Sequence, residues 1–164
     1  MALIITAPKE VYSIENTKNT KLFLAGGVTN CPDWQTAVCK ELRGVDGLTI
    51  YNPRRKTFKD TPQEAEKQIV WEYNHLADAD ILAFWFSHGS LNPITLYELG
   101  RWGNSAKKQL IIGIDPKYQR RQDVIVQTIL ARDDFNAESD FSDELSAFCK
   151  QVCVTVRNRM WWSI

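Results

Sequence analysis

The chain has 164 residues, 44% hydrophobic and 24% charged, which is the composition of one ordinary globular domain. Its 20 basic and 20 acidic side chains leave no formal net charge, so no basic field would hold a polyanion, and nucleic acid is not expected as a partner. No apolar run approaches the roughly 20 residues that span a bilayer, and the N-terminus lacks a signal-peptide pattern. We therefore expect a cytoplasmic protein without a membrane partner.

The four cysteines do not form a metal-binding pattern. Cys149 and Cys153 are one helical turn apart, but neither His75 nor His88 is close to them in sequence. We interpret all four as small buried hydrophobic residues in a reducing cytosol rather than as metal ligands or disulfides, namely Cys31, Cys39, Cys149 and Cys153.

Strand and helix patterns alternate along the chain. Apolar runs bounded by turn residues predict strands at 3–7, 21–25, 48–51, 81–86 and 110–114, and an extended arm at 11–14. Helical spacing predicts helices at 33–43, 61–77, 94–102, 124–131 and 143–157, with a loop at 118–123. This alternation predicts one α/β domain over residues 1–164, with three layers and a parallel sheet covered by helices on both faces.

The strand at 21–25 runs directly into Gly26 and Gly27, and Pro32 is placed to open the next helix. A strand, a glycine turn and a helix bring backbone N–H groups close to a bound phosphate or sugar. The segment lacks the third glycine of the dinucleotide fingerprint and the Lys-Ser/Thr of a P-loop, so a plain tight turn is the alternative. The helix itself has an apolar stripe formed by Trp34, Val38 and Leu42.

A polar loop with Arg54 and Arg55 follows the strand at 48–51. The two arginines either reach an anion in the site or lie in a solvated loop. Thr61 and Pro62 then open a long helix, with Glu64 placed to close a capping box.

In this long helix an acidic residue falls on the predicted apolar stripe. The stripe consists of Ala65, Ile69 and Leu76, and Glu72 lies among them. An acid on the buried face of a helix must be paired or hydrogen-bonded. Glu72 is therefore either a functional group or a structural one that a neighbouring strand or Tyr51 satisfies.

The stretch from Asp78 to Gly103 is the centre of the predicted site. The strand at 81–86 ends in a Ser/Gly/Asn/Pro loop, and the helix after Pro93 places its apolar side chains on one face, namely Leu96, Leu99 and Trp102. Glu98 then falls near the first turn of this helix, at the carboxyl end of a central strand, where α/β sheets bind ligands and the helix dipole favours an ionised carboxylate. The alternative is that Glu98 only caps the helix start.

The C-terminal segment 160–164 carries Trp161 and Trp162. Tryptophans at a terminus are seldom left in water, so we expect them to dock on the core or on a second subunit. We accordingly predict a homo-oligomer.

Several motifs, in this order, resemble those of nucleoside 2-deoxyribosyltransferase-like proteins. They are Phe23-Leu24-Ala25-Gly26-Gly27, Asp33-Trp34-Gln35, Asn52-Pro53-Arg54-Arg55, Gln68-Ile69-Val70-Trp71-Glu72 and Pro93-Ile94-Thr95-Leu96-Tyr97-Glu98-Leu99-Gly100. The resemblance runs from about Leu3 to Val126. It implies a flavodoxin-like or Rossmann-like fold and chemistry at the N-glycosidic bond of a nucleoside or nucleotide.

The resemblance also implies roles for single residues. Glu98 of the Glu-Leu-Gly motif is expected to attack the anomeric carbon, and Glu72 matches an acidic position that is usually Asp in better-known relatives. Where relatives carry Asp-Ser/Gly-Gly-Thr, this chain reads Asn92-Pro93-Ile94-Thr95, so Asn92 can hold a sugar hydroxyl or orient Glu98 but cannot act as an acid. The candidates for substrate binding are Gly26, Gly27, Asn30, Trp34, Tyr51, Asn52, Asp78, Asn92 and Thr95.

Such chemistry has a simple physical form. A carboxylate beneath C1′ stabilises an oxocarbenium-like sugar or forms a glycosyl ester, and a second carboxyl with a raised pKa protonates the departing base. Aromatic side chains near the strand ends would stack the base, with Tyr51, Trp34 and Trp85 as candidates. No metal or organic cofactor is expected. The alternatives to deoxyribosyl transfer are hydrolysis of nucleosides or their 5′-monophosphates and a non-catalytic nucleotide-sensing module.

Overall fold

A computed structural model describes residues 1–9, 18–57 and 61–161 of the chain. The strands are β1 (Leu3–Thr6), β2 (Thr20–Gly26), β3 (Leu48–Asn52), β4 (Ile81–Phe86), β5 (Gln109–Ile114) and β6 (Phe141–Ser142). The helices are α1 (Trp34–Glu41), α2 (Pro62–Asp78), α3 (Pro93–Trp102), α4 (Arg121–Ala131) and α5 (Leu145–Trp161). The predicted arm at 11–14 lies outside the described residues.

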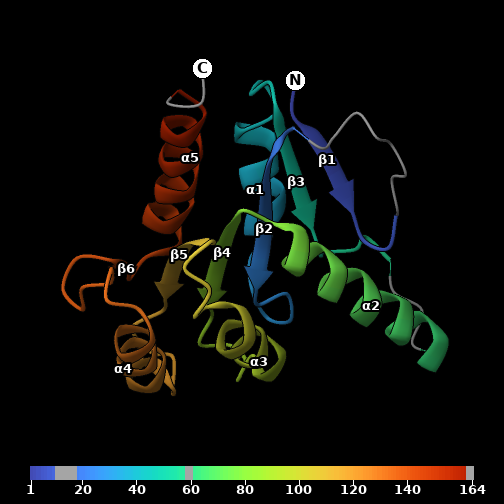
Figure 1. Cartoon of the computed structure of the whole chain (residues 1–164). Helices are drawn as coiled ribbons and strands as arrows, with labels where there is room; N and C mark the ends of the chain where they lie inside the picture. Colours follow the sequence, from blue (N-terminus) through green and yellow to red (C-terminus); the bar gives the residue numbers. More distant parts are fainter. Residues whose placement is uncertain (10–17, 58–60, 162–164) are drawn as a thin grey trace.

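The strands form one parallel sheet in the order β1-β3-β2-β4-β5-β6 (Figure 1). Strands β3 and β1 lie on one side of β2, and strands β5 and β6 lie on the other side of β4. The strand order therefore reverses between β2 and β4, and their carboxyl ends flank the crevice where open α/β sheets bind ligands. The predicted parallel sheet is confirmed.

Helices cover both faces of the sheet and create two hydrophobic cores. On one face α2, α3 and α4 contribute Trp71, Leu99 and Val124 to a core with alternate side chains of the strands. On the other face α1 and α5 contribute Trp34 and Phe148. The predicted three-layer α/β/α fold is confirmed, and β4 is buried along its whole length between the two cores.

Local signals explain where the helices begin. The Asp33 side chain accepts a hydrogen bond from Thr36 N and caps α1, and Thr61 caps α2 by accepting from Glu64 N. The expected capping box is incomplete, because the Glu64 side chain binds Arg55 and Lys67. Helix α4 begins at residue 121, within the predicted loop, and the two-residue strand β6 was not predicted.

The predicted inward stripe of α2 was wrong at Ile69, which is 64% exposed. The face of α2 that packs on the sheet carries Trp71 and Leu76, and Gln68 and Glu72 lie partly buried beside them. The Trp71 side chain anchors this face, because it is 2% exposed and contacts Phe23 of β2. Ile69 consequently points away from the sheet, and Glu72 faces inward as predicted.

The C-terminal helix is only partly docked. Met160 packs against the core shared by α1 and α5, but Trp161 is 79% exposed, so docking of this tryptophan on the core is wrong. Trp162 lies outside the described residues. The predicted burial of the cysteines is confirmed for Cys31, Cys39 and Cys153, and Cys149 is half-buried. Among the helices of the described chain, none has both the length and the apolar character of a membrane span.

Candidate active site

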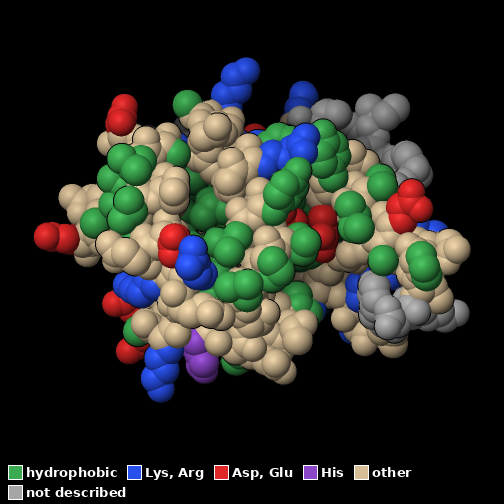
Figure 2. All heavy atoms as spheres, turned by 90° about the horizontal axis from the view of Figure 1, so that it is seen from below, with side chains coloured by type: hydrophobic (Ala, Val, Ile, Leu, Met, Phe, Trp, Pro, Cys, Tyr) green, Lys and Arg blue, Asp and Glu red, His purple; other side chains and the backbone are tan. Residues whose placement is uncertain are grey.

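A cavity of about 280 Å³ lies where the strand order reverses. Its walls come from the end of β2 and the segment after it, Pro53 after β3, α2, the β4–α3 loop and α3. Figure 2 looks onto this end of the molecule and shows acidic side chains among hydrophobic ones near its centre. The lining residues are Phe23, Ala25, Gly26, Gly27, Val28, Thr29, Pro53, Glu72, Ser90, Asn92, Pro93, Ile94, Thr95 and Glu98.

The two glycines allow β2 to turn sharply against β4. Gly26 has a φ of 141°, and a Cβ atom there would lie 2.4 Å from the carbonyl oxygen of Trp85. A Cβ on Gly27 would lie 2.9 Å from Oδ1 of Asn92. Side chains at these positions would separate the two strand ends, so the glycines are needed for the shape of the cavity.

Asn92 shapes the opposite wall. It has a φ of 50°, a left-handed conformation that Asn tolerates better than most residues, and it precedes Pro93 at the start of α3. Its Nδ2 donates to the carbonyl oxygens of Ser87 and Ser90, each at 3.0 Å. The amide nitrogen therefore holds the β4–α3 loop, and the amide oxygen lies beside Gly27.

Glu98 is the sixth residue of α3, so it lies in the second turn of the helix and not near the first turn as predicted. The helix dipole acts mainly on the first turn, so it contributes little to the charge of this group. Burial, followed by the negative charge of Glu72, raises the pKa of Glu98 to about 8. The expectation of a Glu98 that is kept ionised by the helix start was wrong for the free protein.

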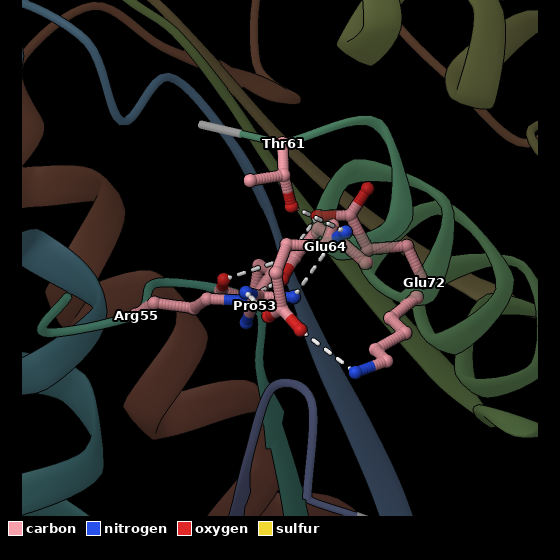
Figure 3. A network of polar contacts seen from close by, with 7 residues as sticks. Pro53, Arg55, Thr61, Glu64 and Glu72 are labelled. Atoms are coloured by element: carbon pink, nitrogen blue, oxygen red, sulfur yellow. Dashed lines mark hydrogen bonds and ion pairs between the residues drawn. The ribbon is translucent and has the colours of Figure 1, made fainter. Parts of the chain in front are cut away.

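Glu72 lies across the cavity on α2. Its Oε1 accepts a hydrogen bond from Nε2 of Gln68 at 2.6 Å, and Gln68 in turn contacts Arg55 (Figure 3). Burial raises the pKa of Glu72, while the hydrogen bond from Gln68 and the positive charge of Arg55 oppose this rise. The partner of Glu72 is thus a residue of its own helix rather than Tyr51.

Six of the predicted site residues meet in this cavity: Gly26, Gly27, Glu72, Asn92, Thr95 and Glu98. The lining also includes residues without a distinctive local sequence signal, since Val28, Ser90 and Ile94 are placed only by the conformation of their loops. A sequence pattern could have indicated Pro53, which directly follows β3 at the same sheet edge.

The other five predicted substrate ligands lie outside the cavity wall. Trp34 is buried on the opposite face of the sheet, edge-on to Phe148. Tyr51 donates a hydrogen bond of 2.5 Å to Asp78, which also binds Lys21. The remaining two form hydrogen bonds within the loops. Oδ1 of Asn52 accepts a hydrogen bond from Arg54 N, and Nδ2 of Asn30 donates one to the carbonyl oxygen of Gly89.

The two arginines after β3 hold protein groups. Arg54 donates to the carbonyl oxygens of Cys31 and Pro32, each at 3.1 Å, and so fixes the segment between β2 and α1. Arg55 binds Gln68 and Glu64, and its side chain is 7% exposed. Their contacts position the walls of the cavity.

A family model described as nucleoside 2-deoxyribosyltransferase like matches residues 19–118, which is more than half of the chain. The chain belongs to this family. The match contains every lining residue of the cavity, from Phe23 to Glu98. No curated protein matches the chain. Membership supports a role in glycosyl transfer on nucleosides in general, and the cavity contains two carboxyls whose pKa values are both raised by burial.

Proposed function

We propose that this member of the nucleoside 2-deoxyribosyltransferase-like family transfers a 2-deoxyribosyl group between nucleobases, with Glu98 as nucleophile and Glu72 as acid. The supporting observation is the pair of carboxyls in one cavity, of which Glu98 has a pKa of about 8. A pair that holds one proton can supply one nucleophile and one acid, which the two-step retaining mechanism requires.

In the first step an oxygen of Glu98 bonds to C1′ as the C1′–N bond breaks. The electron pair of that bond stays on the base nitrogen, and the base takes a proton from Glu72. In the second step a nitrogen of the acceptor base attacks C1′, Glu72 takes its proton, and the ester bond to Glu98 breaks. Water in place of the acceptor base gives hydrolysis.

In the free protein, one proton must move between the two glutamates before the first step can begin. We assign the single proton of the pair to Glu98 when no substrate is bound, because Glu98 has a pKa of about 8 and Glu72 accepts an N–H hydrogen bond from Gln68. It must pass to Glu72 before Glu98 attacks. The transfer leaves the charge of the pair unchanged, so the same total number of protons describes the resting and the reactive protein.

The lining favours a neutral nucleoside over its 5′-monophosphate. Among the described residues, the cavity wall has two carboxyls and no lysine or arginine side chain. A phosphate dianion would be repelled by an ionised glutamate and would find no cation to compensate. Thr29, Ser90 and Thr95 offer hydroxyl groups for the sugar, and Phe23 and Ile94 offer apolar surface for the base.

The test is to incubate the protein with each deoxynucleoside and each 5′-monophosphate, with and without a second free base, and to follow release and exchange of the base. We expect exchange with nucleosides and its loss in Glu98→Gln, because the amide is nearly isosteric but a far poorer nucleophile. A 2-fluoro sugar analogue should add one sugar mass to the peptide that contains Glu98, because fluorine slows turnover of the ester.

The exposed Glu66 of α2 provides the control, and Glu66→Gln should exchange bases like the wild type. Full activity in Glu98→Gln would overturn the mechanism. Base release that does not need an acceptor would instead identify a hydrolase, and measurable binding without any turnover would identify a sensing module.

We also propose that a second copy of the chain covers the surface around the cavity. Ile69 and Tyr73 of α2 and Ile94 and Tyr97 of α3 are large hydrophobic residues that are exposed to solvent. Figure 2 shows hydrophobic side chains gathered on this end of the molecule. A gathering of this kind is typical of protein–protein interfaces.

A further inference from the structure

The amide of Gln68 lies between three fixed groups. Its Nε2 donates to Oε1 of Glu72 at 2.6 Å and to the carbonyl oxygen of Pro53 at 2.9 Å. Its Oε1 accepts a short hydrogen bond from Nε of Arg55. Arg55 is itself held by Glu64, through the carboxylate at 3.0 Å and the backbone carbonyl at 3.2 Å (Figure 3).

These partners permit only one orientation of the amide. A guanidinium can only donate hydrogen bonds, so the oxygen of Gln68 must face Arg55. A backbone carbonyl can only accept, so the nitrogen of Gln68 must face Pro53, and the same nitrogen then faces Glu72. Rotating the amide by 180° would set two donors against each other at Arg55 and two acceptors against each other at Pro53.

We propose that Gln68, oriented by Arg55, is a positioning residue that decides which of the two glutamates holds the shared proton. An N–H donor stabilises the ionised form of Glu72. In the described part of the chain no comparable donor contacts Glu98. The proton therefore stays on Glu98. The significance of this arrangement for catalysis rests on the proposed function.

Of the charged groups around Glu72, Arg55 acts in the same direction as Gln68, and Glu98 acts against it. Glu98 faces it from α3, and Arg55 faces it from the segment after β3. On α2 itself, Glu64 is bound by Arg55 and Lys67, and Nδ1 of His75 contacts the carbonyl oxygen of Trp71. The nearest cation thus favours an ionised Glu72, while Glu72 and Glu98 disfavour each other's charge.

With this arrangement, Glu98 can attack C1′ only when a substrate occupies the cavity. A bound base with an acceptor atom at Glu72 stabilises the neutral acid and draws the proton across from Glu98. Only then is Glu98 a nucleophile. An empty cavity keeps Glu98 protonated and unreactive.

The test compares the wild type with Gln68→Met, which keeps the length of the side chain and removes the donor. Carboxyl titrations by ¹³C NMR on the free protein should show Glu72 titrating about one pH unit higher in the variant. The acid limb of the kcat/KM profile should rise by the same amount, since kcat/KM reports the free protein. A Gln68→Met protein that titrates like the wild type would overturn the proposal.

Arg55→Met should move the titration of Glu72 in the same direction, because it releases the amide and removes a positive charge. Lys67→Met is the matched control, since Lys67 binds the same Glu64 at 2.7 Å on its solvent side. This variant should leave the titration of Glu72 unchanged, and an equal shift in it would overturn the proposed relay.

The two readouts separate this proposal from the proposed function. If no nucleoside is turned over but Gln68→Met shifts the NMR titration of Glu72, the positioning role stands and the enzymatic function fails. If bases are exchanged but the titration and the acid limb do not move, the function stands and the positioning role fails.

Discussion

Replacing Glu98 with Gln should stabilise the protein in alkaline solution while it abolishes activity. The pKa of Glu98 is about 8 in the folded protein, against 4.5 for an ordinary glutamate. Between pH 4.5 and pH 8 the folded state therefore binds a proton that the unfolded state releases. Stability falls as the pH rises through this range, because the folded state binds more protons than the unfolded state.

The difference between the two pKa values, at 1.36 kcal/mol per pH unit, corresponds to at most about 5 kcal/mol. We expect roughly 2–3 kcal/mol, because the side chain retains some contact with water and Glu72 carries part of the effect. Glu98→Gln has no proton to lose. It should match the wild type at pH 5 within about 1 kcal/mol and exceed its free energy of unfolding at pH 8.5.

Urea unfolding of both proteins at pH 5, 7 and 8.5 measures this difference without any substrate. Glu66→Gln, a change at an exposed acid of the neighbouring helix, should show no comparable pH dependence. A Glu98→Gln effect of the same size at all three pH values would refute the assignment of a raised pKa to this partly buried carboxyl. Such a result would also remove the reason for assigning unequal proton affinities to the pair.

Three further predictions concern other parts of the structure. Gly26→Ala should lower the free energy of unfolding in urea by at least about 2 kcal/mol, because Gly26 has a positive φ and a Cβ there would contact the Trp85 carbonyl oxygen. Gly100→Ala, where a Cβ would meet no atom within 4 Å, should leave the free energy of unfolding unchanged or raise it. Tyr51→Phe should cost about 1–2 kcal/mol through loss of the hydrogen bond to Asp78, with base exchange unaffected; a raised KM would show that Tyr51 binds substrate. Ile69→Glu should lower the oligomeric mass measured by light scattering, while Leu130→Glu, at an exposed position of α4, should not.

Most of the sheet could be predicted from the sequence because its strands are buried on both faces. The run Ile81–Phe86 is apolar at every position, and β4 has the same boundaries in the structure. The two-residue strand β6 has no such run. It pairs with β5 in parallel, and helix α4 lies between the two strands in the sequence. Elements defined by tertiary contact alone leave no local pattern.

The error at Ile69 has a related cause. Helical spacing alone fits several choices of inward face, and the hydrophobic residues of α2 are distributed around much of its circumference. Trp71 decides the actual face, because its large side chain fits under Phe23 and its Nε1 donates to the carbonyl oxygen of Lys9. The position of Glu72 was predicted correctly, since it lies next to Trp71.

The candidate site could be located from the sequence, but the ligands on its walls could not. Gly26 and Gly27 lie at the end of β2, and Glu98 lies in the helix that follows β4. A parallel sheet brings residues at the carboxyl ends of its strands to one edge. Tyr51 and Trp34 also lie near this edge in sequence. Their side chains point into the two cores, and the direction of a side chain depends on packing that no short motif encodes.

The distribution of positive charge helps to explain why the pKa values of both cavity glutamates are raised. Arg54 and Arg55 directly follow β3, yet their guanidinium groups bind backbone carbonyls, Gln68 and Glu64 instead of facing the cavity. An arginine at the cavity wall would lower the pKa of both Glu72 and Glu98 and leave the pair fully ionised. In the proposed mechanism the departing base would then have no proton donor. Because the two guanidinium groups lie behind the cavity wall, they position the loops and the Gln68 amide while the pKa values of the two glutamates stay raised.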